Sequence, residues 1–297
     1  MRRVAVGVVV VAVIVLLGFA WYLRPRQTAY YTDADSIMAA VEEAPIRDIL
    51  WQPAQPVGDL INTSQDDYEP RMSSDGQTLY FVRGKAGGGG ADIYWATRTP
   101  EGWTEPAALS AVNSEHDDLG PEPSRDGDAI YFYSDRPGGA GGYDVWRSQR
   151  DGDGWGAPVN LGPGVNSPFN DYGPALTPDG ATLYFASNRP NGNDERPLDP
   201  SAWSATIREE HVHRDYDLYV APISERGHGR AAPVAALNSR HNEGAAAVSA
   251  FGDFLYFASD RPGGLGGYDV YRSRQVRGLF GPPENLGGAI NGAANEL

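Results

Sequence analysis

The residues of this chain that could do chemistry are carboxylates and arginines that recur at regular spacing. Five acids each stand five residues after the asparagine of an Asn-Thr, Asn-Ser or Asn-Gly pair: Asp67, Asp118, Asp171, Glu243 and Glu296. Three arginines each precede a proline, and a lysine takes that slot once: Arg136, Arg189, Arg261 and Lys85. If both groups share one face, they form either ion pairs between repeat units or a charged ring that binds a partner. We expect ion pairs, because buried opposite charges need each other to offset desolvation.

The third repeat carries an insertion, residues 191–215, which is the least repetitive part of the chain. A short helix is predicted from Asp199. The insertion contains an aromatic residue and four potential metal ligands: Trp203, Glu209, Glu210, His211 and His213. The solvated end of a polar helix is the simpler interpretation of these ligands. Because long loops on rigid scaffolds often carry function, we expect a partner to dock on the face that holds the insertion.

Motifs typical of enzymes and cofactor sites are absent from the sequence. There is no cysteine, no Gly-x-Ser-x-Gly elbow and no His-Glu-x-x-His helix. The acidic composition is compatible with calcium, but there is no Asp-x-Asp-x-Asp-Gly ladder. Three aspartates in Ser/Thr-x-Asp-Gly turns are expected to cap the turn amides: Asp75, Asp126 and Asp179. We therefore predict a protein that is not an enzyme and has no cofactor.

The elements that must position these residues are strands, because short apolar runs alternate with turn signals. Leu/Ile-Tyr-Phe triplets recur, and they begin at Leu79, Ile130, Leu183 and Leu255. The repeat unit is about 52 residues long, with about 20 more in the third copy, and each unit holds four strand signals. Such a unit indicates a β-propeller blade. The glycine-rich string SDRPGGLGGYDVYRSR (259–274) precedes a strand and not a helix, so it predicts a tight hairpin loop rather than a phosphate loop.

The string PEPSRDGDAIYFYSDRPGGAGGYDVWRS (121–148) resembles the TolB-type, WD-like propeller repeat. Residues 51–297 are similar to this family, above all to its version in OmpA-type peptidoglycan-associated envelope proteins. The resemblance implies an all-β propeller of four-stranded antiparallel blades that makes protein–protein contacts near peptidoglycan. Two departures stand out. Phe251 replaces the turn aspartate in the fourth repeat, and the first repeat lacks the Ser-Asp-Arg-Pro string.

The strand count predicts an incomplete ring. Four repeats span about residues 62–112, 113–165, 166–237 and 238–290, and residues 291–297 begin a fifth. A segment with the pattern of a fourth strand, residues 53–62, precedes the first repeat, and propellers commonly close through such a strand. We therefore expect at least one further blade. The alternative is a closed four-bladed ring with the early strand as an addition.

The first 26 residues predict a membrane anchor. Val4 to Leu23 is an unbroken apolar run that matches the thickness of a bilayer, and arginines flank both ends. A cleaved signal peptide is the alternative, since Gly18-Phe19-Ala20 offers small residues before a cut. Residues 27–50 form a predicted stalk with a short helix, followed by the propeller at 51–297. The net charge of −15 argues against nucleic acid as a partner.

Together these features predict a single-pass membrane protein whose periplasmic propeller is a protein-binding scaffold of the cell envelope. The expected partners are envelope proteins or a peptidoglycan-associated protein, and the N-terminal helix binds the membrane. Two alternatives stay open. The chain is the N-terminal propeller of a larger prolyl-oligopeptidase-like hydrolase, or it is a carbohydrate-binding propeller.

Overall fold

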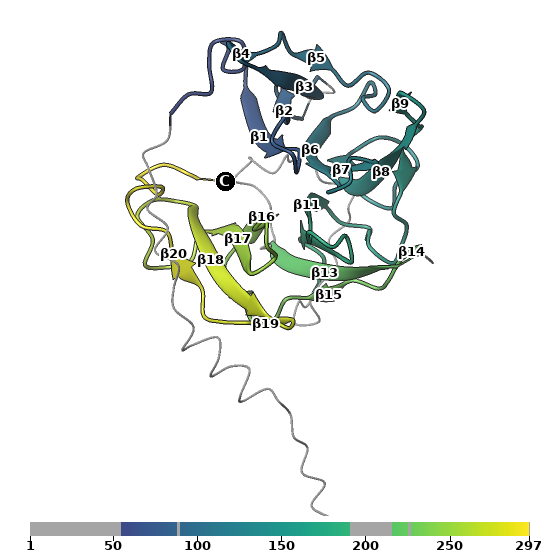
Figure 1. Ribbon diagram of the computed structural model, residues 1–297. Helices are drawn as coiled ribbons and strands as arrows, with labels where there is room; N and C mark the ends of the chain where they lie inside the picture. The colour runs from purple at the N-terminus through teal and green to yellow at the C-terminus, as the bar shows by residue number, and fades with distance from the viewer. Residues whose placement is uncertain (1–54, 88–89, 191–215, 225–226, 297) are drawn as a thin grey trace, which may run out of the picture. The chain divides into compact units, whose positions relative to one another are not determined.

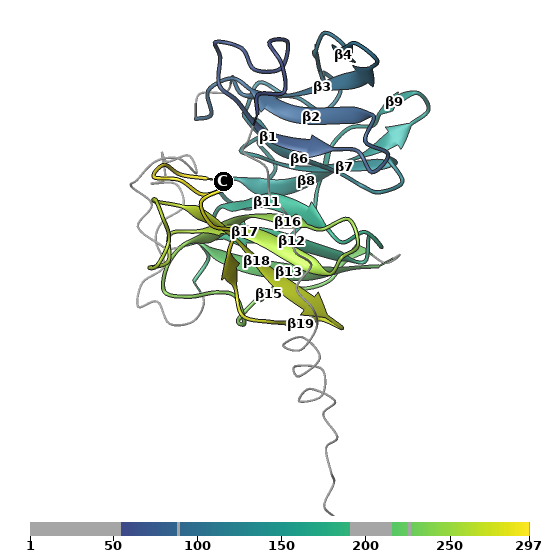
Figure 2. The same ribbon diagram turned by 60° about the vertical axis from the view of Figure 1, so that its left-hand side comes forward.

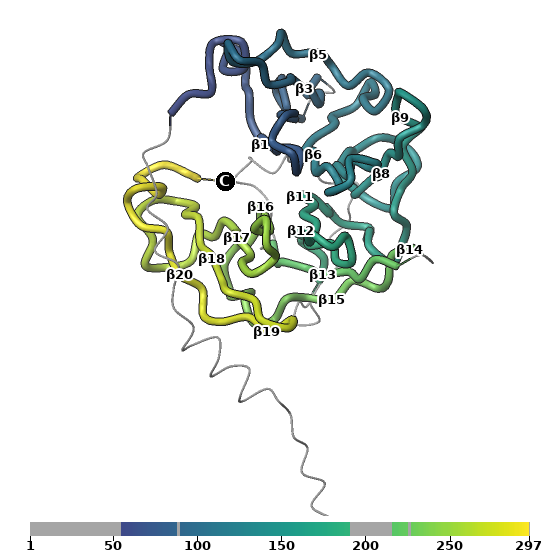
Figure 3. The backbone as a smooth tube through the Cα atoms, viewed as in Figure 1, coloured from purple at the N-terminus to yellow at the C-terminus, as the bar shows by residue number. Residues whose placement is uncertain are grey.

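The computed structural model describes residues 55–87, 90–190, 216–224 and 227–296, which form a four-blade antiparallel β-propeller (Figure 1). Each blade is one sheet. Its first three strands follow one another along the chain, and two short pieces pair with the outer edge of the third. The blades succeed one another around a common centre, as the colour gradient in Figure 3 shows. The predicted all-β propeller of antiparallel blades is confirmed, with the fourth strand of each blade split in two.

The strand bounds repeat from blade to blade. Blade 1 contains β1 (Asp67–Met72), β2 (Thr78–Arg83), β3 (Asp92–Thr99), β4 (Gly102–Trp103) and β5 (Ala107–Ala108). Blade 2 contains β6 (Asp118–Pro123), β7 (Ala129–Ser134), β8 (Asp144–Asp151), β9 (Gly154–Trp155) and β10 (Val159–Asn160). Blade 3 contains β11 (Asp171–Leu176), β12 (Thr182–Ser187), β13 (Asp217–Ser224), β14 (Gly227–His228) and β15 (Ala232–Pro233). Blade 4 contains β16 (Glu243–Val248), β17 (Phe254–Ser259), β18 (Asp269–Val276), β19 (Leu279–Phe280) and β20 (Glu284–Asn285).

Four predicted segments fall wholly or partly outside the described residues. The anchor at 1–26, the stalk at 27–50 and the insertion at 191–215 lie outside them, so these remain predictions. Of the predicted early strand at 53–62, residues 55–62 are described, and they contain no strand. No helix with the length and apolarity of a membrane span occurs in the part of the chain that the structure describes.

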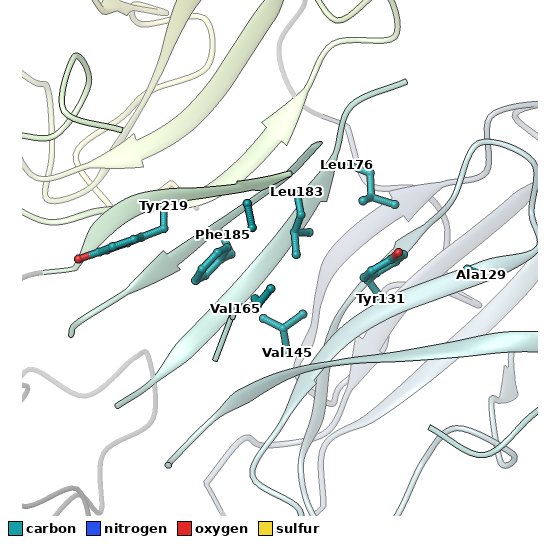
Figure 4. Close-up of a cluster of buried hydrophobic side chains, with 9 residues drawn as sticks. Ala129, Tyr131, Val145, Val165, Leu176, Leu183, Phe185 and Tyr219 are labelled. Atoms are coloured by element: carbon teal, nitrogen blue, oxygen red, sulfur yellow. The ribbon is translucent and has the colours of Figure 1, made fainter. Parts of the chain in front are cut away.

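The aromatic triplets lie in the second strand of each blade and build the core between blades. Between blades 2 and 3, Tyr131 and Val145 pack against Leu183 and Phe185 (Figure 4). All four are at most 5% exposed, and complete burial of side chains of this size contributes about 1.5–3 kcal/mol each. Equivalent clusters join blade 1 to blade 2 and blade 3 to blade 4. Because a neighbouring blade covers each face, β7 is buried along its whole length instead of alternating.

A β-bulge bends the first strand of every blade at the centre of the propeller. The pairing register shifts at the third residue of each first strand, and all four of these residues have positive φ: Glu69, Gly120, Gly173 and Ala245. The first strands of neighbouring blades contact one another there, and Figure 2 shows β6, β11 and β16 close together. At Glu69 the bulge turns a carboxylate toward blade 2, where it accepts hydrogen bonds from Gly120 N and from the Tyr133 hydroxyl, each at 2.8 Å.

Candidate functional site

Antiparallel strands give the propeller two faces with different connections. We call one the loop face; it carries the links that lead into each first strand and the loops between the second and third strands. The turn face carries the tight turns between the first and second strands and the turns after each third strand. The predicted acid and arginine positions lie on the loop face, and the Ser/Thr-x-Asp-Gly turns lie on the turn face.

On the loop face, each repeated acid is held by an arginine of its own blade. In blade 3, Arg189 Nη2 lies 2.5 Å from Asp171 Oδ1, and its Nε donates to Ser187 Oγ at 2.8 Å. The same Nη2 donates to the Val165 carbonyl, and the Ser167 amide donates to Asp171 Oδ2 at 2.6 Å. The guanidinium thus ties the start of β11 to the end of β12 and to the link from the preceding blade.

The same arrangement recurs in the other blades. Arg136 pairs with Asp118 in blade 2, and Arg261 Nη2 lies 2.9 Å from Glu243 Oε1 in blade 4. These pairs correct one expectation, because acid and arginine belong to the same blade and not to neighbouring ones. The acid begins the first strand and pairs with the last residue of the second strand, and the arginine follows two residues later, which places both groups within reach.

In blade 1 a different residue pairs with the repeated acid, and the sequence pattern did not predict it. Arg83, the last residue of β2, lies 2.6 Å from Asp67 Oδ1 and donates to the Leu60 and Ile61 carbonyls. Lys85, which was expected in this slot, is exposed. Arg83 occupies the position at which the other blades have a serine, so spacing alone pointed to the wrong cation.

Because these ion pairs are buried, they have a structural role in the propeller. Asp118, Asp171 and Glu243 are fully buried. Burial raises the pKa of Asp171, and the charge and hydrogen bonds of Arg189 oppose that rise. At Asp67 burial also acts to raise the pKa, but hydrogen bonds from Arg83 and the neighbouring turn outweigh it and lower the pKa. Carboxylates satisfied in this way have little capacity left for a ligand, which favours the structural role.

The glycine loops bind a carboxylate of the chain itself. In blade 2 the Ala140 amide donates to Asp144 Oδ2, and in blade 4 the equivalent Asp269 accepts from the same place in its loop. A Cβ at Gly139 would lie 2.1 Å from Asp144 Oδ2, and one at Gly264 would lie 2.0 Å from Asp269 Oδ2. Burial raises the pKa of Asp144 to about 6. The glycines therefore make room for an internal anion, which confirms the hairpin interpretation.

On the turn face, three of the four tight turns use the predicted aspartate. Asp75 accepts from the Gln77 amide at 2.9 Å, and Asp126 and Asp179 accept equivalent bonds at 3.0 Å. These bonds confirm the capping prediction. In blade 4 the turn has Phe251 instead, and its side chain is 79% exposed. Asp253 takes over the bond from the Ser249 hydroxyl, at 2.9 Å.

Two cavities open on the turn face, and Phe251 lines one of them. One of about 540 Å³ lies between the turns of blades 3 and 4, where Phe251, Tyr184 and Arg277 line it together with Arg125. The other, of about 330 Å³, lies nearer the centre and is lined by Arg125, Leu176, Val248 and the half-exposed Met72, among others. Sequence reasoning missed this region, although its one signal, the loss of the turn aspartate in the fourth repeat, was visible.

The remaining predicted site residues lie in the insertion, outside the described residues: Trp203, Glu209, Glu210, His211 and His213. Within the described ranges, no group of three or more His, Asp or Glu side chains could hold a metal ion.

No protein-family model matches the sequence, and no curated protein matches it. Among solved structures, the chain is similar to TolB from Acinetobacter baumannii, at 14% identity and a TM-score of 0.47, over 76% of this chain and 45% of that one. It is similar to a putative TolB from Agrobacterium tumefaciens, at 17% identity and a TM-score of 0.47, over 78% and 66%. A puromycin-hydrolyzing peptidase from Mycobacterium tuberculosis gives 16% identity and a TM-score of 0.43, over 81% and 31%. The chain spans less than two thirds of the length of each of these proteins.

Proposed function

We propose that this chain is a protein-binding scaffold of the cell envelope, and that it docks its partner on the turn face. The observation that carries the proposal is Phe251, a large apolar side chain that is 79% exposed and lines a cavity of about 540 Å³. Exposed aromatic residues next to a pocket are typical of protein-binding surfaces. In the other three blades the same position carries an aspartate that serves the turn.

The surroundings of Phe251 define the chemistry of the partner. Arg125 and Arg277 are exposed and line the same cavity, although the chain as a whole has a net charge of −15. The cavity nearer the centre offers apolar walls from Leu176 and Val248. A segment with an apolar anchor and an acidic group close to it fits these features, with the acid facing the arginines.

We infer binding rather than catalysis as the activity, because the repeated carboxylates of the described residues already form ion pairs and hydrogen bonds within the propeller. Asp118, Asp171 and Glu243 face arginines, and Asp144 faces loop amides. We further propose that the apolar segment within residues 1–26 anchors the propeller on the periplasmic side, where the partner is an envelope or peptidoglycan-associated protein. The insertion at 191–215 is proposed as a second contact, on the loop face.

Capture from envelope extracts tests the docking face. Phe251→Asp restores the turn aspartate of the other blades, so it removes the exposed ring and supports the turn. Leu265→Asp is the matched control, because Leu265 is 55% exposed on the loop face. We expect Phe251→Asp to abolish capture while Leu265→Asp retains it. If Phe251→Asp captures the same proteins in the same amounts, the turn face is not the docking site. A variant that lacks residues 195–213 and captures as before would exclude the insertion.

A further inference from the structure

The two cavities of the turn face share part of their lining. We call the one of about 330 Å³ near the centre the inner cavity, and the one of about 540 Å³ between blades 3 and 4 the outer cavity. Arg125, Thr177 and Pro178 line both. Because these residues are common to them, the two cavities form one groove that runs outward from the centre along the tight turn between β11 and β12.

The outer cavity collects residues that depart from the repeat. Four of its lining residues occupy positions at which the other repeats have different residue types: Arg125, Phe251, Gln275 and Arg277. The position of Arg277, for example, is held by Pro100 in blade 1 and by Gly152 in blade 2. Arg277 also has a φ of 50°, a left-handed conformation that glycine adopts more easily. Departures that the fold does not require, gathered around one cavity, indicate a binding site.

The outer cavity offers hydrogen-bond donors to a ligand. Tyr184, which is only 2% exposed, lines it, and the Tyr184 hydroxyl accepts a hydrogen bond from Gln275 Nε2 at 2.8 Å. Because Gln275 occupies a lone pair of that oxygen, the hydroxyl proton remains available for an acceptor. Arg125 and Arg277 are exposed and line the same cavity. Two guanidinium groups and a hydroxyl proton together suit a carboxylate.

One acid of the outer cavity limits the charge of the ligand. Asp179 lines this cavity, and hydrogen bonds from Thr177 Oγ1 at 2.6 Å and Ala181 N at 3.0 Å lower the pKa of Asp179. Asp179 is therefore negatively charged at neutral pH. A phosphate dianion would be repelled more strongly by this carboxylate than a ligand with a single negative charge, so a carboxylate is the better match.

The inner cavity suits an apolar side chain. Leu176, Val248 and the half-exposed Met72 contribute apolar walls. Glu122 lines this cavity as well, but its carboxylate accepts hydrogen bonds from the Leu176 amide at 2.9 Å and from Arg71 Nε at 3.1 Å. Because Glu122 is already paired within the propeller, the unoccupied chemistry of the inner cavity is its apolar surface.

We propose that the groove binds an extended segment of the partner, with an apolar side chain in the inner cavity and a glutamate in the outer cavity. This inference rests on the proposed function and adds that the partner presents a linear motif. Alternate side chains of an extended chain point to the same side, about 7 Å apart, so one residue separates the apolar residue from the glutamate. The glutamate carboxylate accepts from Arg125, Arg277 and the Tyr184 hydroxyl. Glutamate fits better than aspartate, because its longer side chain reaches the buried Tyr184.

The probe is the capped peptide acetyl-Gly-Ser-Leu-Ser-Glu-Ser-Gly-amide, and its binding to the full chain in detergent solution is followed by saturation-transfer NMR. We expect saturable binding that weakens at least fivefold when glutamine replaces the glutamate. Exchanging the glutamate with the serine before it should weaken binding as much, because adjacent side chains of an extended chain point to opposite sides. In the chain, Arg277→Gln or Tyr184→Phe should weaken binding of the glutamate peptide at least fivefold and of the glutamine peptide less than twofold. Arg240→Gln, at an exposed position of the loop face, is the matched control and should bind as before.

Three outcomes would overturn the proposal. The first is no binding at a peptide concentration of about 5 mM, at which even a millimolar site is occupied. The second is equal binding of the three peptides. The third is glutamate-dependent binding that neither Arg277→Gln nor Tyr184→Phe weakens, because the peptide would then lie elsewhere. If one of these occurs while Phe251→Asp abolishes capture from envelope extracts, the turn face docks its partner through other contacts and the proposed function stands. The expected peptide binding with capture unchanged by Phe251→Asp would instead retain the groove and refute the proposed function.

Discussion

Replacing Arg189 by alanine removes the guanidinium that faces the Asp171 carboxylate at 2.5 Å. Asp171 is fully buried, and the Arg189 side chain is only 16% exposed, so water cannot fully replace the lost charge. Removing one partner of a buried ion pair typically costs about 3–5 kcal/mol, because the other charge stays buried without compensation. For a propeller of this size each kcal/mol lowers the melting temperature by about 2–4 °C, so we expect a loss of about 10 °C.

Calorimetry on a double-mutant cycle measures this effect. Asp171→Asn alone leaves Arg189 without its charge partner, and the double variant Asp171→Asn with Arg189→Ala removes both charges. We expect the double variant to lose less stability than the sum of the two single losses, since neither buried charge is then unmatched. Arg230→Ala, at an exposed position of the same blade, is the matched control. A loss at Arg189 no larger than at Arg230, or strict additivity in the cycle, would refute the reasoning.

Three further predictions concern the glycine loop, its acid and the bulge. Gly139→Ala places a Cβ 2.1 Å from Asp144 Oδ2 and should lower the melting temperature by several degrees. Gly154→Ala should not, because its Cβ would make only an ordinary contact of 3.8 Å with the Asp151 carbonyl oxygen; equal effects would refute the steric argument. Burial raises the pKa of Asp144 from 3.8 to about 6, so its contribution to stability is full below pH 3.8 and is lost as the pH rises through 6. The melting temperature of Asp144→Asn relative to the wild type should therefore increase between pH 4 and pH 7. Asp126→Asn should show the opposite trend, and only below about pH 4, because hydrogen bonds lower the pKa of Asp126 and its contribution is lost as the pH falls below 3.8; parallel pH profiles would contradict both assignments. Ala245→Gly relieves a residue held at φ of 47° and should stabilise the fold by about 0.5–1 kcal/mol in urea unfolding, and a loss of stability would show that the bulge is unstrained.

Much of this fold was predictable because it repeats. The Leu/Ile-Tyr-Phe triplets and the turn aspartates recur in register, and both occupy the expected places. That Asp118 and Arg136 lie on one face followed from spacing as well, since the start of the first strand and the loop after the second strand are at the same end of an antiparallel blade. That acid and arginine belong to the same blade did not follow, because spacing does not say which loop folds over which.

The features that escaped prediction are departures from the repeat. Arg83 holds Asp67 from a strand end, a position that no other repeat uses for a cation. Glycine marks the bulge in blades 2 and 3, but Glu69 and Ala245 occupy the equivalent positions in blades 1 and 4. Neither residue type indicates a positive φ, so tertiary packing imposes the conformation there and the sequence did not predict it. Phe251 was noticed as an exception, but its exposure depends on neighbouring turns that only the folded chain brings together.

Photo-crosslinking at position 251 tests the proposed docking face most directly. Benzoylphenylalanine replaces Phe251 with little change of shape, and the same residue placed at position 265 on the loop face provides the comparison. In cells that export the chain, irradiation should yield a discrete adduct with one envelope protein from position 251 and none from position 265. Arg125→Glu in the same chain should weaken that adduct. A chain that forms no adduct from position 251, or equal adducts from both positions, would contradict a scaffold that docks its partner on the turn face.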